Sequence, residues 1–449
     1  MQETSVLHDF IITNQQVLSK WSRYWFAEIF FSALTACGTV SSWILNSDNP
    51  KRYKKFYYFL QRLGEQNVAI QIANVAWLLG ALHKDLQQAT SVRFALDDSP
   101  IKRSGPKIEG AGLMHDPTNA TNKNAICYGH SLVMLSLIVD HPKWGTTSLP
   151  FLWSFYVRKD DLPQIDEALR PEFQTKLQIG IDLVTHAAAI IRKTLDKPIH
   201  LTFDRGYVSK DLFEAMDQLD VDVITRFKYN ANFYELPEKP TTPKRGRPRK
   251  FGNAFKLEDW LANNDSETVR EEIMLYGGLK CVEFKTMIAT SRITNGRPVR
   301  LVASRLVTDG KASSWGVFVS TNLSATPQEI LSEYSRRFSI EEMFKDMKEV
   351  CGLGRQETRK WQSCVACTTI TALKFAVVEI LTWDEDASEL TSSRSPWDNP
   401  NRRPSHRNKR DFVARKIGFE IFSRIIPEAK NGVFREKILW LARFLGMGT

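Results

Sequence analysis

Three acidic positions stand where a fold could bring carboxylates together. Asp98, or its neighbour Asp97, ends one apolar run, and Asp204 ends another. Glu341 supplies a third acid from the helical pattern YSRRFSIEEMFKDMK. Carboxylate oxygens are preferred ligands of hard divalent ions, and two such ions can stabilise the attacking and leaving oxygens of a phosphodiester. The three acids therefore predict metal-dependent phosphodiester cleavage.

The third acid belongs to one polar face of its predicted helix. Four residues with suitable offsets fall within about 60° of one another around a helix. They are Tyr334, Arg337, Glu341 and Lys348. Glu342 points elsewhere, so Glu341 is the better candidate for a metal ligand. Arg337 and Lys348 are spaced to hold the phosphates of a DNA strand beside that acid.

Each of these features also has an ordinary structural explanation. Acids at strand ends often cap the next element, and Arg337 with Glu341 has the i,i+4 spacing of a surface ion pair. Either feature alone favours that explanation. The features together, in this order along an α/β pattern, favour a catalytic site.

The elements that must position the acids follow an α/β order. Strand-like apolar runs occur at Val92–Leu96, Ser131–Val139, Ser148–Val157, Ile199–Phe203 and Val221–Phe227. Helical spacing covers Gln164–Leu195 and Lys210–Leu219. Because helices alternate with the later strands, those strands are expected to be parallel neighbours. The pattern predicts a mixed sheet flanked by helices.

The first part of the chain is different. Residues 1–90 show helical spacing without strand-like alternation, which predicts a helical N-terminal domain. Within it, Ile29–Leu45 is expected to form one buried helix. The basic segment Lys51–Leu63 is either a DNA-docking helix or a helix with a solvated charged face, and the sequence leaves both open.

The pattern changes again after the last parallel strand. Residues 229–321 contain short alternating runs and predict a β-rich insertion, so that residues 91–228 and 322–383 form one split domain. Pro327–Met347 returns to helical spacing and is expected to be a single helix. Residues 384–449 are predicted to be a basic linker followed by a C-terminal helical segment.

A short basic motif lies inside the predicted insertion. Lys244–Lys250 has Arg245, Arg247 and Arg249 separated by Gly and Pro. Such a stretch resembles an AT-hook, whose arginines enter a narrow minor groove. A flexible basic loop that contacts phosphates alone explains the motif equally well.

Composition bounds the class of protein. The 449 residues include 43% hydrophobic and 25% charged residues, as in ordinary globular domains, and carry a formal net charge of +10. A basic balance favours a polyanionic partner such as DNA. The six cysteines are scattered, which indicates a reducing compartment, and the N-terminus lacks the pattern of a secretion signal. We therefore expect a cytoplasmic protein without a membrane partner.

The residues named so far resemble bacterial insertion-sequence transposases of the DDE superfamily, in the branch with a Tyr-x(2)-Arg-x(3)-Glu-x(6)-Lys signature. The match at Tyr334, Arg337, Glu341 and Lys348 keeps every spacing, and LDDSPIKRSG and FDRGY extend the likeness. The resemblance implies a ribonuclease H-like fold. It also implies cut-and-paste transposition by a homodimer on paired element ends, with terminal-repeat DNA and target DNA as partners.

Carried over residue by residue, the resemblance makes Asp98, Asp204 and Glu341 the ligands of two Mg²⁺ or Mn²⁺ ions. The first ligand has an alternative. Asp98 before Ser99 fits the usual family pattern, whereas Asp97 fits an Asp-x-Ser variant. Alternation along the strand does not decide which sheet face holds the site. Asp98 is preferred.

Two other functions remain compatible with the sequence. One is a non-catalytic DNA-binding regulator derived from a transposase, and the presence of all three acids speaks against it. The other is a nuclease of the same fold that cleaves without strand transfer. Inverted repeats flanking the gene would favour a transposase over such a nuclease. In similar transposases an aromatic residue of the insertion stacks on a flipped base, for which Trp315 is a candidate, although core packing explains Trp315 as well.

Overall fold

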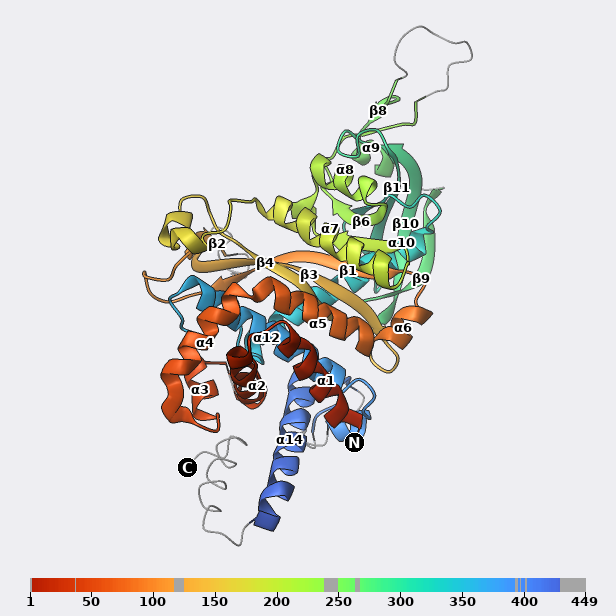
Figure 1. The fold of residues 1–449 in the computed structure, drawn as a ribbon. Coiled ribbons are helices and arrows are strands. Elements are labelled where there is room, and N and C mark those ends of the chain that lie inside the picture. Colours follow the sequence, from red (N-terminus) through yellow and green to blue (C-terminus); the bar gives the residue numbers. More distant parts are fainter. Residues whose placement is uncertain are drawn as a thin grey trace.

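One long mixed sheet runs through the protein (Figure 1). The computed structural model describes residues 2–428 apart from residues 37, 117–124, 238–248, 263–266, 392–394, 396 and 400–401. The first strands of the sheet are β1 (Val92–Lys102), β2 (Gly112–His115), β3 (Ile126–His141), β4 (Gly145–Tyr156), β5 (Ile199–Phe203) and β6 (Val221–Phe227). β3 is antiparallel to both β1 and β4, whereas β1, β5 and β6 are parallel. The mixed sheet with parallel neighbours is confirmed, and this strand arrangement is consistent with a ribonuclease H-like fold.

Two crossover helices lie on one face of the sheet. They are α7 (Lys176–Thr194) and α8 (Lys210–Gln218). Gly180 lets α7 approach β1, because a Cβ atom at this position would meet Leu96 Cδ2 at 2.7 Å. The predicted helical start at Gln164 is wrong. Proline at 163 and 171 interrupts that stretch, which forms the short turns η2 (Leu162–Gln164) and η3 (Glu167–Leu169) instead.

The other face is covered by the N-terminal helices and by helices from the second half of the chain (Figure 1). The N-terminal elements are α1 (Gln2–Gln16), α2 (Lys20–Thr35), α3 (Val40–Leu45), η1 (Pro50–Arg52), α4 (Tyr53–Glu65), α5 (Asn67–Ala81) and α6 (His83–Gln88). A single hydrophobic cluster extends from Phe10 to Val413. The N-terminal helices therefore share their core with the sheet.

The expected single helix over Ile29–Leu45 is two helices. α2 ends at Thr35 and α3 begins at Val40. Between them Gly38 adopts a φ of +63°, a left-handed conformation that glycine adopts without strain. Thr39 then caps α3 through a capping box with Ser42. In α4, Phe56 and Phe59 are buried as its amphipathic pattern predicts.

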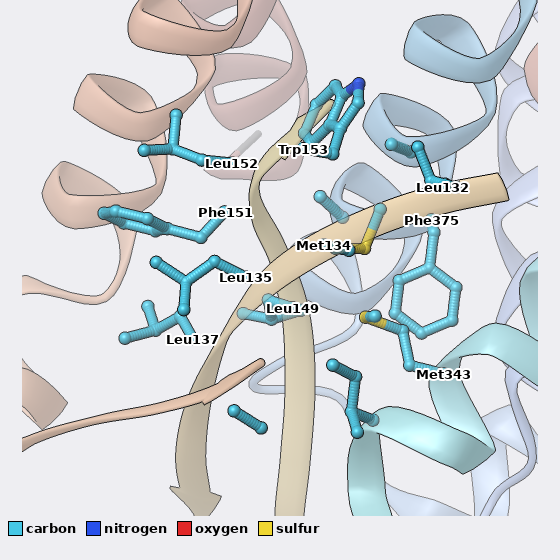
Figure 2. Close-up of a cluster of buried hydrophobic side chains, with 14 of the residues drawn as sticks. Leu132, Met134, Leu135, Leu137, Leu149, Phe151, Leu152, Trp153, Met343 and Phe375 are labelled. Atoms are coloured by element: carbon cyan, nitrogen blue, oxygen red, sulfur yellow. The ribbon is translucent and has the colours of Figure 1, made fainter. Parts of the chain in front are cut away.

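The helices of the second half follow the insertion. They are α10 (Pro327–Arg336), α11 (Phe338–Glu349), α12 (Trp361–Leu381), α13 (Ala387–Leu390) and α14 (His406–Glu428). A short turn earlier in the chain, η4 (Arg205–Tyr207), lies between β5 and α8. Figure 2 shows Leu132 and Met134 of β3 on the side of the strand toward Phe375 of α12 and Met343 of α11. α12 is apolar and long enough to cross a bilayer, but 94% of its most apolar window is buried inside the protein. It is packed as a core helix.

The insertion continues the same sheet. Its elements are β7 (Phe233–Tyr234), β8 (Ala254–Phe255), α9 (Leu257–Ala262), β9 (Val269–Leu275), β10 (Gly278–Thr290), β11 (Pro298–Thr308), β12 (Lys311–Ala312) and β13 (Gly316–Ser320). β13 pairs antiparallel with β6, and β11 and β10 follow it. The β-rich character is as predicted, and the pairing of β13 with β6 joins the insertion rigidly to the parallel strands.

Candidate active site

The parallel pairing of β1 with β5 brings two acids to the same level of the sheet. Leu96 is the register partner of Phe203. The next residue on each strand is therefore an acid, Asp97 on β1 and Asp204 directly after β5. Asp204 is the N-cap residue of η4, and its carbonyl accepts from the backbone N–H of Tyr207 at 2.9 Å.

The face of β1 that carries Asp97 packs against α10 and α11. Arg93 Nε donates to Glu333 Oε1 at 2.9 Å, and Arg337 Nη1 donates to Asp97 Oδ2 at 3.2 Å. Two residues further along the strand, Lys348 Nζ donates to Ser99 Oγ at 2.6 Å. Side chains alternate along a strand, so residues at odd-numbered positions share one face. The contacts of Arg93, Asp97 and Ser99 show that this face is the one toward α10 and toward α11, the helix of Glu341.

Asp98 points to the opposite face. Its Oδ2 accepts from Lys176 Nζ at 2.6 Å and from Ser131 Oγ at 3.3 Å. Its Oδ1 accepts from the hydroxyl of Tyr207 at 3.1 Å. The structure therefore brings Asp97, and not the preferred Asp98, to the side of Glu341. The physical reason is the alternation of the strand, which gives adjacent residues opposite faces.

Glu341 is linked to Asp97 through Arg337. Arg337 Nη2 donates to Glu341 Oε1 at 2.5 Å, so the same guanidinium contacts both acids. The predicted single helix over 327–347 is divided at this residue. Arg337 N bonds to the carbonyl of Tyr334, three residues earlier, which tightens the chain between α10 and α11. The i,i+4 pairing of Arg337 with Glu341 nevertheless persists.

An open cavity of about 250 Å³ adjoins this bridge. Its lining combines one acid with cations and aromatic rings: Asp204, Arg205, Arg226, Tyr276, Tyr334, Arg337 and Phe338. The Arg337 guanidinium carbon lies 5.5 Å from the centre of the Tyr334 ring. Such a lining suits a phosphate group, because arginines present paired donors to its oxygens.

Electrostatics distinguish Asp97 from an ordinary surface acid. Burial raises the pKa of Asp97 to about 7, although Arg337 and the backbone N–H of Asp98 act to lower it; the charges of Asp98 and Glu341 add smaller increases. The pKa of Lys348 is lowered, mainly by burial and also by Lys102. Carboxylates held close together in a partly buried site repel one another, and a bound cation would reduce that repulsion.

Tyr276 lines the cavity but was not singled out by the sequence. It and Gly277 form the two-residue turn between β9 and β10, and both have positive φ, 53° and 77°. This turn projects the Tyr276 ring, which is 57% exposed, to within 6.1 Å of the ring centre of Phe338. Trp315 instead packs against Arg305, whose guanidinium carbon lies 4.5 Å from the centre of the Trp315 ring. A Tyr-Gly pair between two alternating runs is the signal that could have found this hairpin tip.

The basic motif predicted to contact DNA is described only in part. Arg249 is exposed. Arg245 and Arg247 fall outside the described residues. Among the residues that the structure describes, no three histidine, cysteine or acidic side chains stand close enough to form a metal-ligand group. Asp97 and Glu341 instead both contact the Arg337 guanidinium between them.

Two family models match this chain. One, described as DDE superfamily endonuclease, matches residues 20–276 and includes Asp97 and Asp204. The other, described as Transposase DDE domain, matches residues 181–372 and includes Asp204 and Glu341. The first model covers more than half of the 449 residues. No curated protein matches the chain.

Proposed function

This chain belongs to the DDE superfamily of endonucleases, and on that premise we propose that it is a transposase that cuts DNA at the ends of its element and joins them to a target. The observation that carries the proposal is that Asp97 and Asp204 follow paired residues of two parallel strands, while Arg337 contacts both Asp97 and Glu341. The Tyr-Arg-Glu-Lys branch is part of the same proposal.

The acids suit the metal that this chemistry requires. Asp97, Asp204 and Glu341 offer only carboxylate oxygens, which fit hard ions such as Mg²⁺ or Mn²⁺. We assign these three residues as the ligands of two ions, with Asp97 in place of Asp98. When bound, the ions would stabilise charge on the attacking and leaving oxygens.

The protein's own side chains would hold the DNA strand. Arg337, Arg205 and Arg226 surround the cavity beside Asp204 and can bind a backbone phosphate through paired hydrogen bonds. The Arg337 guanidinium lies over the Tyr334 ring. Lys348, held by Ser99 further along the same face of β1, extends the cationic path. Tyr276 and Phe338 provide exposed rings at the rim for contact with a base.

The wider setting of the reaction follows from the family and the charge. Two element ends must be cut together, so we propose a homodimer that binds terminal-repeat DNA and target DNA. The net charge of +10 favours such a polyanionic partner. The protein would act in the cytoplasm, on DNA of the nucleoid.

The test is a cleavage assay on linear DNA that carries the sequences flanking the gene. With Mg²⁺ present, Asp97→Ala, Asp204→Ala and Glu341→Ala should each abolish detectable cleavage while DNA binding, measured by gel shift, is retained. Glu342→Ala is the matched control, because Glu342 points to Arg403 instead of Asp97. It should cleave like the wild type.

Other outcomes identify the alternatives. Normal cleavage by Asp204→Ala or Glu341→Ala would refute the site. DNA binding by the wild type without cleavage would indicate a regulator derived from a transposase. Cleavage without joining of pre-cut ends to a target plasmid would indicate a nuclease of the same fold.

A further inference from the structure

Arg337 occupies a special position, because one guanidinium contacts two acids that are proposed to bind the same metals. Its two terminal nitrogens are divided between Asp97 Oδ2, at 3.2 Å, and Glu341 Oε1, at 2.5 Å. The Arg337 side chain is only 11% exposed. The protein therefore supplies its own cation to the space between these acids.

An internal cation of this kind competes with a divalent ion. A carboxylate oxygen that accepts a charge-assisted hydrogen bond from Arg337 has less capacity to ligate a metal. A divalent ion that did bind between the acids would also be repelled by the guanidinium. Metal binding to the DNA-free protein is weakened as long as Arg337 stays between Asp97 and Glu341.

The neighbouring cavity offers Arg337 another partner. Tyr334 and Arg205 line the same cavity with Arg337. Among the described residues, Arg337 Nε is buried without a hydrogen-bond partner. A phosphate in this cavity could accept from that nitrogen and from a terminal nitrogen at once, which is the bidentate geometry that arginine prefers.

We propose that Arg337 is an internal counter-ion that couples DNA binding to metal binding. In the DNA-free protein it forms an ion pair with both Asp97 and Glu341 and holds their affinity for divalent ions low. A DNA phosphate in the cavity draws Arg337 away and frees both acids to bind metal. This inference rests on the proposed function, since it takes the acids as metal ligands. By linkage, bound metal must strengthen phosphate binding by the same factor.

The test measures metal binding directly, without a cleavage readout. The signal of free Mn²⁺ in electron paramagnetic resonance gives the Mn²⁺ affinity of the full-length protein, with and without a short duplex of unrelated sequence. Mn²⁺ bound by the duplex alone is subtracted. For the wild type, the duplex should tighten Mn²⁺ binding at least about fivefold, the lower end of ordinary coupling.

Arg337→Gln should separate the two states of the site. Without DNA it should bind Mn²⁺ at least about fivefold more tightly than the wild type, and the duplex should add little. Arg336→Gln is the matched control, because Arg336 is the neighbouring arginine but pairs with Asp140 of β3 and with Glu333 of its own helix, α10. It should keep the wild-type coupling. Arg337→Lys, which keeps the charge without the forked donors, should fall between Arg337→Gln and the wild type.

The outcomes distinguish this inference from the proposed function. If Asp204→Asn weakens Mn²⁺ binding but Arg337→Gln binds Mn²⁺ no more tightly than the wild type, the coupling is refuted and the metal site stands. If the wild type binds no Mn²⁺ with or without DNA, both fail. Thermal melting of each variant identifies any loss of folding, and Arg337→Lys then carries the test.

Discussion

The adjacent acids Asp97 and Asp98 lie on opposite faces of β1 and have different hydrogen-bond partners. Asp97 faces α11 and shares its cation, Arg337, with Glu341 beside an open cavity. Asp98 faces α7 and has a cation of its own, Lys176, together with two hydroxyl donors. An acid whose only cation is shared can exchange it for a metal. An acid with three dedicated donors is fixed, and its contribution must be to position other groups.

We infer that Asp98 positions Asp204. Tyr207, which donates to Asp98, ends the η4 turn, and Asp204 directly precedes that turn. The hydrogen bond therefore ties this turn to β1 from the side opposite the cavity. One face of the strand carries the acid that we propose to bind metal, and the other is tied to the turn that follows β5.

The largest expected difference between the faces is in catalysis. Asp97→Asn removes a proposed metal ligand and should lower the cleavage rate more than about 10³-fold, since metal stabilisation of the transition state amounts to several kcal/mol. Asp98→Asn keeps an acceptor for Tyr207 and should lower the rate about 10- to 100-fold, as for other residues that orient ligands. Initial rates at saturating Mg²⁺ decide between them. A greater loss in Asp98→Asn than in Asp97→Asn would reverse the assignment of the two faces.

A smaller effect is expected when only the hydroxyl is lost. Tyr207→Phe should lower the cleavage rate about tenfold and raise the Mg²⁺ concentration needed for half-maximal rate, because the turn after Asp204 loses its hydrogen bond to β1. Combining it with Asp98→Ala should cost no more than Asp98→Ala alone, since both break one hydrogen bond. The Mg²⁺ concentration for half-maximal rate is the readout, because a change in general stability would not move it. Additive losses in the double variant would show that the two residues act separately.

The sequence predicted that Asp97 and Asp98 lie near the site, but not which of them faces Glu341. Alternation along β1 requires Asp97 and Asp98 to face opposite ways, but nothing local says which face meets Glu341. That choice depends on the packing of α10 on β1, through the ion pair of Arg93 with Glu333. Long-range contacts of this kind have no signature in residue spacing, so the preference for Asp98 followed the family pattern alone.

Elements with strong local signals were predicted well, and breaks within them were not. The parallel strands β5 and β6 were recognised from their apolar runs. The helix predicted from Gln164 begins only at Lys176, because proline outweighs apolar spacing. The division near Arg337 has no proline or glycine to mark it. The pairing of β13 with β6 likewise joins segments that are distant in sequence.

The pH dependence of stability should also differ between the faces. Because the pKa of Asp97 is raised to about 7 in the folded protein, folding favours its protonated form. Its stabilising contribution is complete below the unfolded pKa of about 4 and is lost as pH rises through 7. In metal-free buffer, the melting temperature of the wild type relative to Asp97→Asn should therefore fall by roughly a few degrees between pH 4 and 7 and then level off. A constant difference across this range would contradict the burial of Asp97.

The smallest effect is expected from the packing of α7 on β1. Gly180→Ala introduces a Cβ atom 2.7 Å from Leu96 Cδ2, the flexible end of a side chain that can shift. The gain in helix propensity, about 1 kcal/mol, should offset part of the cost of overpacking, about 1 to 3 kcal/mol. We expect a net loss of about 1 kcal/mol in the free energy of unfolding, with unchanged Mn²⁺ affinity. Gly80→Ala in α5 is the matched control, since no heavy atom lies within 4 Å of its new Cβ, and it should be stabilising. A loss of Mn²⁺ affinity in Gly180→Ala would mean that the α7 face reaches the metal site directly, and the separation of the two faces would fail.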